Sequence, residues 1–325
     1  MSGIVSEKGG NAGEKSVMRK RLRRISNVLL LLTALIWGIA FVAQSVAMDR
    51  IGPWAFVFWR FSIAGLFLLP VSKISEKPYR SSRADSERSG ENGCLLLIGG
   101  LSSGIFLGIA SVLQQFGIVS TSVGKAGFIT ALYIIFVPIA GLFLKQRPGK
   151  MVWISALIAV CGFYFIAMQT GAGLSIAAGD VLMLLSSFLY TAQILCIDRY
   201  SPRVNPVLLS NVQFLGAAAV GGIGMLLFER PDLGALRAAA VPILYAGIFS
   251  GAIGYTLQIV GQRYTEPALA SLLMSMESIF SALAGWLILG QKMSGRESFG
   301  CALVFFAVLL AQHSESVKAR HQETV

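Results

Sequence analysis

A single glutamate, Glu277, stands in the middle of the apolar stretch ASLLMSMESIFSALAGW, residues 270–286. An acid at membrane depth is costly and usually faces protein or a water-filled cavity. Three roles are open to it: a protonated acid hydrogen-bonded for structure, a carboxylate that binds a cationic part of a substrate, and a carboxylate that loads and releases a proton. Burial favours the neutral form of an acid.

Helix geometry predicts which way Glu277 points. Residues three or four apart share one face of a helix. The face of Glu277 is then a stripe of small or polar residues: Ala270, Met274, Ser281, Ala284 and Gly285. Small residues permit close approach between helices in a membrane. We therefore expect the glutamate to turn away from lipid.

Five further polar or aromatic residues in apolar segments are candidates for lining a substrate path: Trp37, Arg60, Gln114, Tyr133 and Gln258. Arg60 has an alternative role, in which its side chain snorkels to the outer interface. The two glutamines have another, an interhelical hydrogen bond. Tyr255 could join Trp37 and Tyr133 in an aromatic wall, although membrane Trp and Tyr residues also serve as packing or interface residues.

Catalytic and metal-binding chemistry is not expected. His313 and His321 lie at or beyond the last apolar segment, and the four cysteines lie within apolar segments without a C-x-x-C spacing. No pair of acid and base or nucleophile dyad is visible. We predict no catalytic residues, no metal and no other cofactor.

The elements that position these residues are apolar segments of membrane-spanning length. The chain has 325 residues, of which 55% are hydrophobic and only 13% charged, whereas about a quarter of a soluble domain is charged. Runs of about 20 apolar residues span the hydrocarbon as helices. Ten such runs are present, at 26–48, 54–72, 94–119, 122–144, 151–169, 177–197, 206–228, 240–261, 267–289 and 297–313. The prediction is an all-α integral membrane protein with ten transmembrane helices.

The positive charges predict the orientation. Of the 27 Lys and Arg residues, 20 fall in the tails and in alternate loops, and five fall in the loops between them. Because Lys and Arg concentrate on the cytoplasmic side, both termini are expected in the cytoplasm and the chain in the cell membrane. The net charge of +11 is then a topology signal and does not indicate a nucleic-acid partner. Residues 1–25 and 314–325 are expected as cytoplasmic tails, and 72–92 as a flexible cytoplasmic loop.

An internal repeat divides the chain. Residues 109–141 align without a gap on residues 253–285, at an offset of 144, with ten identities in 33 positions. NVLLLLTALIW (27–37) also answers DVLMLLSSFLY (180–190), at an offset of 153. The repeats are predicted as 26–169 and 177–313, inverted because each has five spans, with a site between them near the midplane. Tyr133, equivalent to Glu277, should lie on the opposite wall.

Four motifs in order resemble the EamA-type ten-helix permeases of the drug/metabolite transporter superfamily. They are LIWGIAFV (35–42), FVFWRFSIAGLFLLP (56–70) with Arg60, STSVGKAGFITALYIIFVPIAGLF (120–143), and ALASLLMSMESIFSALAGWLILGQ (268–291) with Glu277. Two positions depart from the family at helix ends, where it often has glutamate and this chain has Gln146 and Gln291. The family also often has proline where this chain has Ser278. The resemblance covers roughly residues 26–313 and implies a permease.

The prediction is a non-enzymatic transporter that moves a small organic solute by alternating access. It is expected to be a secondary transporter, and coupling to protons is one form that this could take. The expected partners are a small-molecule substrate and the lipid bilayer, with no nucleic acid, and the chain is expected as a monomer or homodimer. The alternative is a non-transporting scaffold or sensor on the same fold, which a sealed core would favour. A membrane-embedded enzyme comes third.

Overall fold

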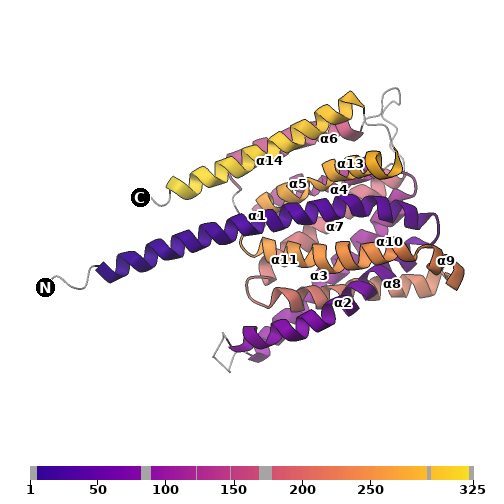
Figure 1. Ribbon diagram of the computed structural model, residues 1–325, viewed down its shortest axis with the longest axis horizontal. Helices are drawn as coiled ribbons and strands as arrows, with labels where there is room; N and C mark the ends of the chain where they lie inside the picture. Colours follow the sequence, from indigo (N-terminus) through magenta and orange to yellow (C-terminus); the bar gives the residue numbers. More distant parts are fainter. Residues whose placement is uncertain are drawn as a thin grey trace.

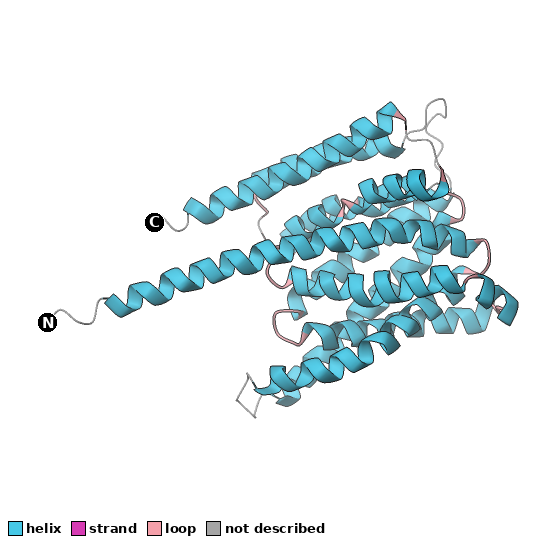
Figure 2. Ribbon diagram, viewed as in Figure 1, coloured by secondary structure: helices cyan, strands magenta, loops and turns pink. Residues whose placement is uncertain are grey.

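The protein is helical throughout the part of the chain that the structure describes. The structure, a computed structural model, describes residues 6–81, 89–121, 123–146, 148–167, 178–290 and 294–321. Figure 2 shows helices joined by short loops, with no strand in those ranges. The helices are α1 (Ser6–Met48), α2 (Pro53–Ser81), α3 (Ser89–Ile118), α4 (Val123–Ala131), α5 (Tyr133–Phe143), α6 (Lys150–Ala167), α7 (Ala178–Tyr200), α8 (Pro206–Phe228), α9 (Leu233–Ala238), α10 (Ala240–Tyr245), the π-helix η2 (Ala246–Tyr255), α11 (Thr256–Gln262), α12 (Pro267–Met274), α13 (Glu277–Leu289) and α14 (Gly295–His321).

These helices make ten crossings. Among the described residues, nine helical segments are long and apolar enough to span a membrane, and α6 contributes the shorter apolar helix Lys150–Phe165. Two spans, Val123–Phe143 and Pro267–Leu289, are broken into α4 with α5 and α12 with α13. The span Ala240–Gln262 combines α10, η2 and α11. The predicted all-α fold with ten transmembrane helices is confirmed.

Two segments predicted outside the membrane are more helical than expected. α1 begins at Ser6, within the predicted tail, and its apolar span begins at Arg21. The segment 72–92, predicted as a flexible loop, is helical at 72–81 and 89–92, while 82–88 lie outside the described residues. Lys, Arg and Glu are good helix formers, so polar extensions continue the apolar helices. Figure 1 shows the start of α1 projecting beyond the bundle.

Each half packs its equivalent helices against the same helices of the other half. α3 of the first half packs against α7 and α8, and its counterpart, the span 240–262, packs against α1 and α2. The last helix of each half, α6 or α14, lies against the other (Figure 1). The start of α1 and the end of α14 lie on the same side of the bundle (Figure 1), as an even number of crossings requires. The two repeats are inverted because each contributes five crossings.

Equivalent residues of the two repeats meet in the middle of the molecule. α2 begins at Pro53 and α8 at Pro206, 153 residues later, and the same offset joins Phe61 to Phe214. These two buried rings stack with their centroids 6.0 Å apart and their planes at 17°. Equivalent residues can touch only next to the two-fold axis, so the axis passes close to this ring pair.

The break in each repeat falls at the same place. The backbone N–H of Leu132 donates to Ile129, three residues back, and that of Met276, 144 residues later, donates to Leu273. Such 3₁₀-type bonds tighten a helical turn. The next helices, α5 and α13, then begin at Tyr133 and Glu277, which are themselves repeat equivalents. The break therefore sets the direction of these two side chains.

Candidate functional site

The first feature of the site is the contact between Tyr133 and Glu277. The phenol Oη of Tyr133 donates a hydrogen bond of 2.9 Å to Oε1 of Glu277. Their side chains are buried, at 2% and 3% exposure. A second pair of equivalent residues thus meets across the two-fold axis. The sequence placed them on opposite walls of one cavity, and they face each other as expected.

Helix α1 approaches the backbone of α13 closely at Glu277. A Cβ on Gly38 would lie 2.3 Å from Cβ of Phe280 and 2.9 Å from the backbone oxygen of Glu277. No side chain fits there without moving one of the helices, since real contacts of this kind are longer. The absence of a side chain at Gly38 therefore lets α1 pack directly on the first turn of α13.

Tyr133 and Glu277 belong to the wall of a cavity between the repeats. The cavity contains about 380 Å³ of space not occupied by protein atoms, including space that opens to the outside. Its wall contains residues from α1, α2, α3, α4, α5, α7, η2, α11 and α13: Trp37, Phe41, Gln44, Arg60, Gln114, Thr130, Tyr133, Tyr190, Gln193, Ile194, Ser250, Tyr255, Gln258 and Glu277. Among these lining residues, Arg60 is the one cation and Glu277 the one acid.

All six residues predicted for the site lie on this wall. The structure brings together Trp37, Arg60, Gln114, Tyr133, Gln258 and Glu277 from both repeats. Tyr255, considered for an aromatic wall, also lines the cavity, and its ring centroid lies 4.6 Å from that of Trp37. Their location is thereby established, whereas a role in substrate binding or coupling stays a prediction.

Arg60 does not snorkel to an interface. Its side chain is 2% exposed, and Nη2 donates a hydrogen bond of 2.8 Å to Oγ of Ser250. Its guanidinium carbon lies 5.8 Å from the ring centroid of Tyr255. Within the described chain, Nε and Nη1 have no hydrogen-bond partner. Of the two roles considered for Arg60, the structure places its side chain in the one that faces the cavity.

The two glutamines satisfy both of the roles considered for them. Nε2 of Gln114 donates to Thr130 at 3.1 Å, and its Oε1 accepts from the phenol of Tyr190 at 3.1 Å. Gln258 and Gln193 lie within hydrogen-bond distance, 3.2 Å, between their amide groups. Each glutamine therefore joins different helices and also lines the cavity.

The π-helix η2 positions the wall opposite Glu277. Its residue Ser250 accepts two hydrogen bonds, one at Oγ from Arg60 and one at its backbone oxygen from Nε1 of Trp37, the latter at 3.2 Å. A π-helical segment widens the backbone spacing and is frequent at functional sites. The sequence shows only a Gly-rich run at 246–255, and nothing in it predicted the π-helix or a role for Ser250.

Tyr190 is a lining residue that the sequence reasoning missed. Its phenol lies 3.2 Å from Oγ of Ser111 and also donates to Gln114. The signal was present, because Tyr190 is the residue aligned with Trp37 at the offset of 153. Ser111 is likewise the equivalent of Tyr255 at the offset of 144, so the pair of Tyr190 with Ser111 repeats the pair of Trp37 with Tyr255.

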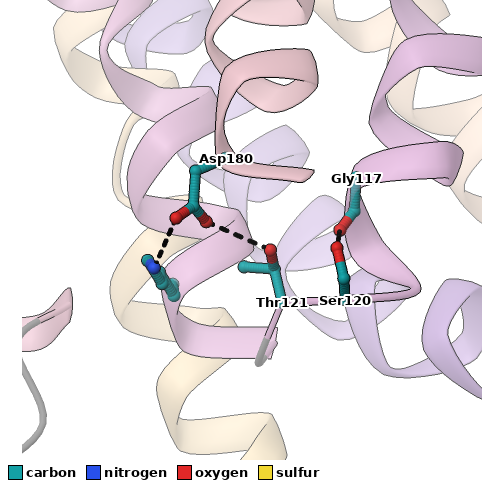
Figure 3. A network of polar contacts seen from close by, with 5 residues as sticks. Gly117, Ser120, Thr121 and Asp180 are labelled. Carbon is teal, nitrogen blue, oxygen red and sulfur yellow. Dashed lines mark hydrogen bonds and ion pairs between the residues drawn. The ribbon is translucent and has the colours of Figure 1, made fainter. Parts of the chain in front are cut away.

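A second polar cluster joins the start of α7 to α4 and to the turn after α3 (Figure 3). Nζ of Lys125 forms an ion pair of 2.6 Å with Oδ2 of Asp180, and Thr121 donates to Oδ1 at 3.2 Å. Ser120 caps the same turn by donating to the backbone oxygen of Gly117 (Figure 3). Lys125 thus supplies the cation of a contact between α4 and α7.

Comparison with known proteins gives the same fold and a family. The model of the EamA-like transporter family matches residues 24–168 and again residues 177–312. The chain is similar to a protein named "Uncharacterized transporter" from Archaeoglobus fulgidus, with 28% identity over 94% of this chain and 90% of the relative. It is also similar to "Protein PecM" from Dickeya dadantii, with 23% identity over 67% of this chain and 73% of the relative. One solved crystal structure, 17% identical, matches with a TM-score of 0.70 over 92% of this chain and 98% of the other, a likeness of fold alone. Since the family model covers most of the chain in two copies that follow the two helical repeats, this protein belongs to the EamA-like transporter family.

Proposed function

We propose that this protein is a secondary transporter that moves a small organic metabolite across the cytoplasmic membrane by alternating access, with both termini in the cytoplasm. Family membership makes the chain a membrane transporter in general terms. The observation that supports the finer proposal is the buried polar cavity between the two inverted repeats. Transporters of this architecture bind substrate near the midplane, at the repeat interface.

Matching contacts at the two ends of the bundle support alternating access. At one end, Thr121 bonds to Asp180, whereas at the other Thr265 donates to Oδ1 of Asn27 at 3.3 Å. Thr265 is the equivalent of Thr121 at the offset of 144, and Asn27 is the equivalent of Asp180 at 153. Each contact joins one half to the other, so the two equivalent contacts provide two related gates. A rocking motion that opens one gate can leave the other closed.

A further pair of equivalent contacts differs between the repeats. The amide of Gln115 on α3 donates to the amide oxygen of Gln44 on α1. The equivalents of these residues, Ile259 and Ile197, are fully buried in one apolar cluster. The contact in the first repeat is polar and that in the second is apolar, so the two repeats differ in the helix contacts that a change of state would rearrange. This asymmetry favours one resting state over the other.

Glu277 is the residue we propose for coupling to protons. The ionisable groups that share its cavity are Tyr133, Tyr190, Tyr255 and Arg60. Of these groups, the carboxyl is the one whose ordinary titration range lies nearest to neutral pH. Intramembrane carboxylates that alternate between neutral and charged forms serve as proton relays in transporters. The Tyr133 hydroxyl donates a hydrogen bond to this carboxyl, so the strength of that bond would change whenever the carboxyl gains or loses its proton.

The alternative, a scaffold or sensor without transport, receives less support. A sealed core would favour it, whereas the wall here contains an arginine, a glutamate, four amide side chains and five hydroxyl side chains around one space. Buried polar groups are costly unless they are paired. A structural scaffold gains nothing from such a cavity, while a transporter uses it to bind substrate.

The test joins each gate covalently. Cysteine pairs replace Thr121 with Asp180, or Asn27 with Thr265, in a chain whose native cysteines are serine, and each pair is joined with a reducible bifunctional thiol reagent. The cargo is first identified by metabolite profiling of cells with and without the gene. We expect either cross-link to stop its transport in proteoliposomes and reduction to restore it, while each single cysteine treated alike stays active. Undiminished transport with both ends joined would contradict alternating access.

A further inference from the structure

The guanidinium of Arg60 is buried with most of its hydrogen-bonding capacity unused. An arginine side chain offers five N–H groups, and Ser250 accepts one of them, from Nη2. Nε and Nη1 are without a partner among the described residues, although the side chain is only 2% exposed. Leaving a buried charged donor unpaired is unfavourable. Arg60 is one of the residues that line the cavity.

Glu277, the acid of the cavity, is not a hydrogen-bond partner of the Arg60 guanidinium. Oε1 of Glu277 is bonded to Tyr133, and the described partner of the Arg60 guanidinium is the neutral hydroxyl of Ser250. The cation therefore lies against a hydroxyl and the rings of Phe61 and Tyr255, whose centroids are 5.1 and 5.8 Å away. None of these contacts supplies a negative charge. An anionic group inside the cavity would supply it.

We propose that the substrate carries a carboxylate and that Arg60 binds this group directly. Since Ser250 uses a single N–H, at least one pair of parallel N–H groups remains on the guanidinium. Such a pair matches the two oxygens of a carboxylate in bidentate geometry, which a lysine ammonium cannot reproduce. The proposal rests on the proposed function, because it takes the cavity to be the substrate site.

The repeat equivalence shows that this feature is built into one half alone. At the offset of 153, the counterpart of Arg60 is Gln213, whose Oε1 accepts from the amide of Gln193. A glutamine at this position is sufficient for the packing of α8, which contains Gln213 fully buried. Packing at this position therefore does not require a charge. The variant Arg60→Gln places at position 60 the residue that the second repeat already has at its equivalent, Gln213.

The skeleton of the substrate has an aromatic surface beside the carboxylate site. The rings of Trp37 and Tyr255 lie 4.6 Å apart and line the cavity next to Arg60. The bonded pair of Tyr133 and Glu277 provides a second polar group in the same cavity. A monocarboxylate with an apolar body places its charge on Arg60 and its body against the rings.

The experiment measures binding and transport separately. For binding, purified protein in nanodiscs is titrated with acetate, benzoate, phenylacetate and 3-phenylpropionate, each paired with its amide, and with inorganic phosphate, using thermal stabilisation and tryptophan fluorescence. We expect at least one acid to bind about 10-fold more tightly than its amide and than phosphate. Arg60→Gln should weaken this acid by about 10- to 100-fold, as for a lost charge-assisted bond, and Arg60→Lys should restore part of the loss. Arg237→Gln, on the exposed helix α9, removes the same charge and should change nothing.

The outcomes separate this inference from the proposed function. If no acid binds more tightly than its amide, or if Arg60→Gln folds and binds the acid as the wild type does, the carboxylate proposal is overturned. In the transport arm, metabolite profiling compares cells with the wild type, Arg60→Gln and Arg237→Gln. A cargo without an anionic group overturns the inference while transport stands. Acid binding that depends on Arg60, with no cargo moved by any form, supports the inference and counts against the transport function.

Discussion

The hydrogen bond between Tyr133 and Glu277 offers a measurement of the charge on the buried acid. The perturbation is a double-mutant cycle of Tyr133→Phe, Glu277→Gln and both together. The bond is 2.9 Å long and its partners are 2% and 3% exposed, so water does not replace it. A neutral hydrogen bond of this kind contributes about 0.5–1.5 kcal/mol, and one to a charged group about 1.5–3 kcal/mol. The coupling energy therefore distinguishes a protonated from an ionised Glu277.

We expect a coupling energy of about 1 kcal/mol, because burial favours the neutral acid. The assay is reversible unfolding of the four proteins in detergent micelles at neutral pH. As a control, Tyr245→Phe removes a hydroxyl that bonds to the backbone of Ile36. Because the hydrogen bonds of Tyr245 and Glu277 have no partner in common, its combination with Glu277→Gln should be additive within about 0.5 kcal/mol. A coupling energy above about 2 kcal/mol would refute the assignment of a neutral acid.

The same substitution tests coupling in transport. Glutamine keeps the shape and hydrogen-bonding capacity of Glu277 and removes its titratable proton. Glu277→Gln should therefore stay folded, with a loss of about 1 kcal/mol, and should exchange substrate without responding to an imposed pH difference in proteoliposomes. Full pH-driven accumulation by the variant would show that coupling lies elsewhere. Loss of substrate binding altogether would instead indicate that the carboxylate recognises the substrate.

Three further predictions follow from the packing and the topology. Gly38→Ala should lower stability in micelles by about 1–3 kcal/mol, because its Cβ would lie 2.3 Å from that of Phe280, whereas Gly124→Ala, with no atom within 4 Å, should not. Asp180→Asn should break a partly exposed ion pair that contributes about 1 kcal/mol or less. If this ion pair belongs to a gate, a single cysteine placed in the cavity should be labelled up to about fivefold faster by an impermeant reagent added outside. Unchanged labelling would contradict the assignment of this contact to a gate. Arg237→Cys should react with an impermeant maleimide on intact cells, and reaction only after permeabilisation would contradict the predicted topology.

The fold was predictable because lipid leaves few choices. A chain in hydrocarbon must satisfy its backbone within helices, so ten apolar runs gave ten crossings. The repeat was visible because polar residues such as Gln114 and Gln258 align at the offset of 144. The site residues were predictable for a related reason. A polar residue inside an apolar segment is costly when it faces lipid, and all six of those chosen line the cavity.

The local geometry that orients these residues was not predictable. The breaks at Leu132 and Met276 contain neither glycine nor proline, the residues that most often mark a kink, and tertiary packing decides them. The side chain of Arg60 has two low-cost directions in a membrane helix, and the choice of the cavity depends on Ser250, which lies 190 residues away in a π-helix. Such distant partners leave no trace in the pattern of one helix.

The departures from symmetry are where function is encoded in this fold. A duplicated, inverted scaffold by itself would give a cavity with two identical walls and two identical gates. Arg60 stands opposite Gln213, Tyr133 opposite Glu277, and Lys125 corresponds to Leu269 in the second repeat. At each of these three positions one repeat has a cationic or carboxyl group that the other lacks. The two walls therefore differ in charge, so that a substrate with one anionic end would have a preferred orientation, and the two gates differ in strength, so that one resting state would be favoured.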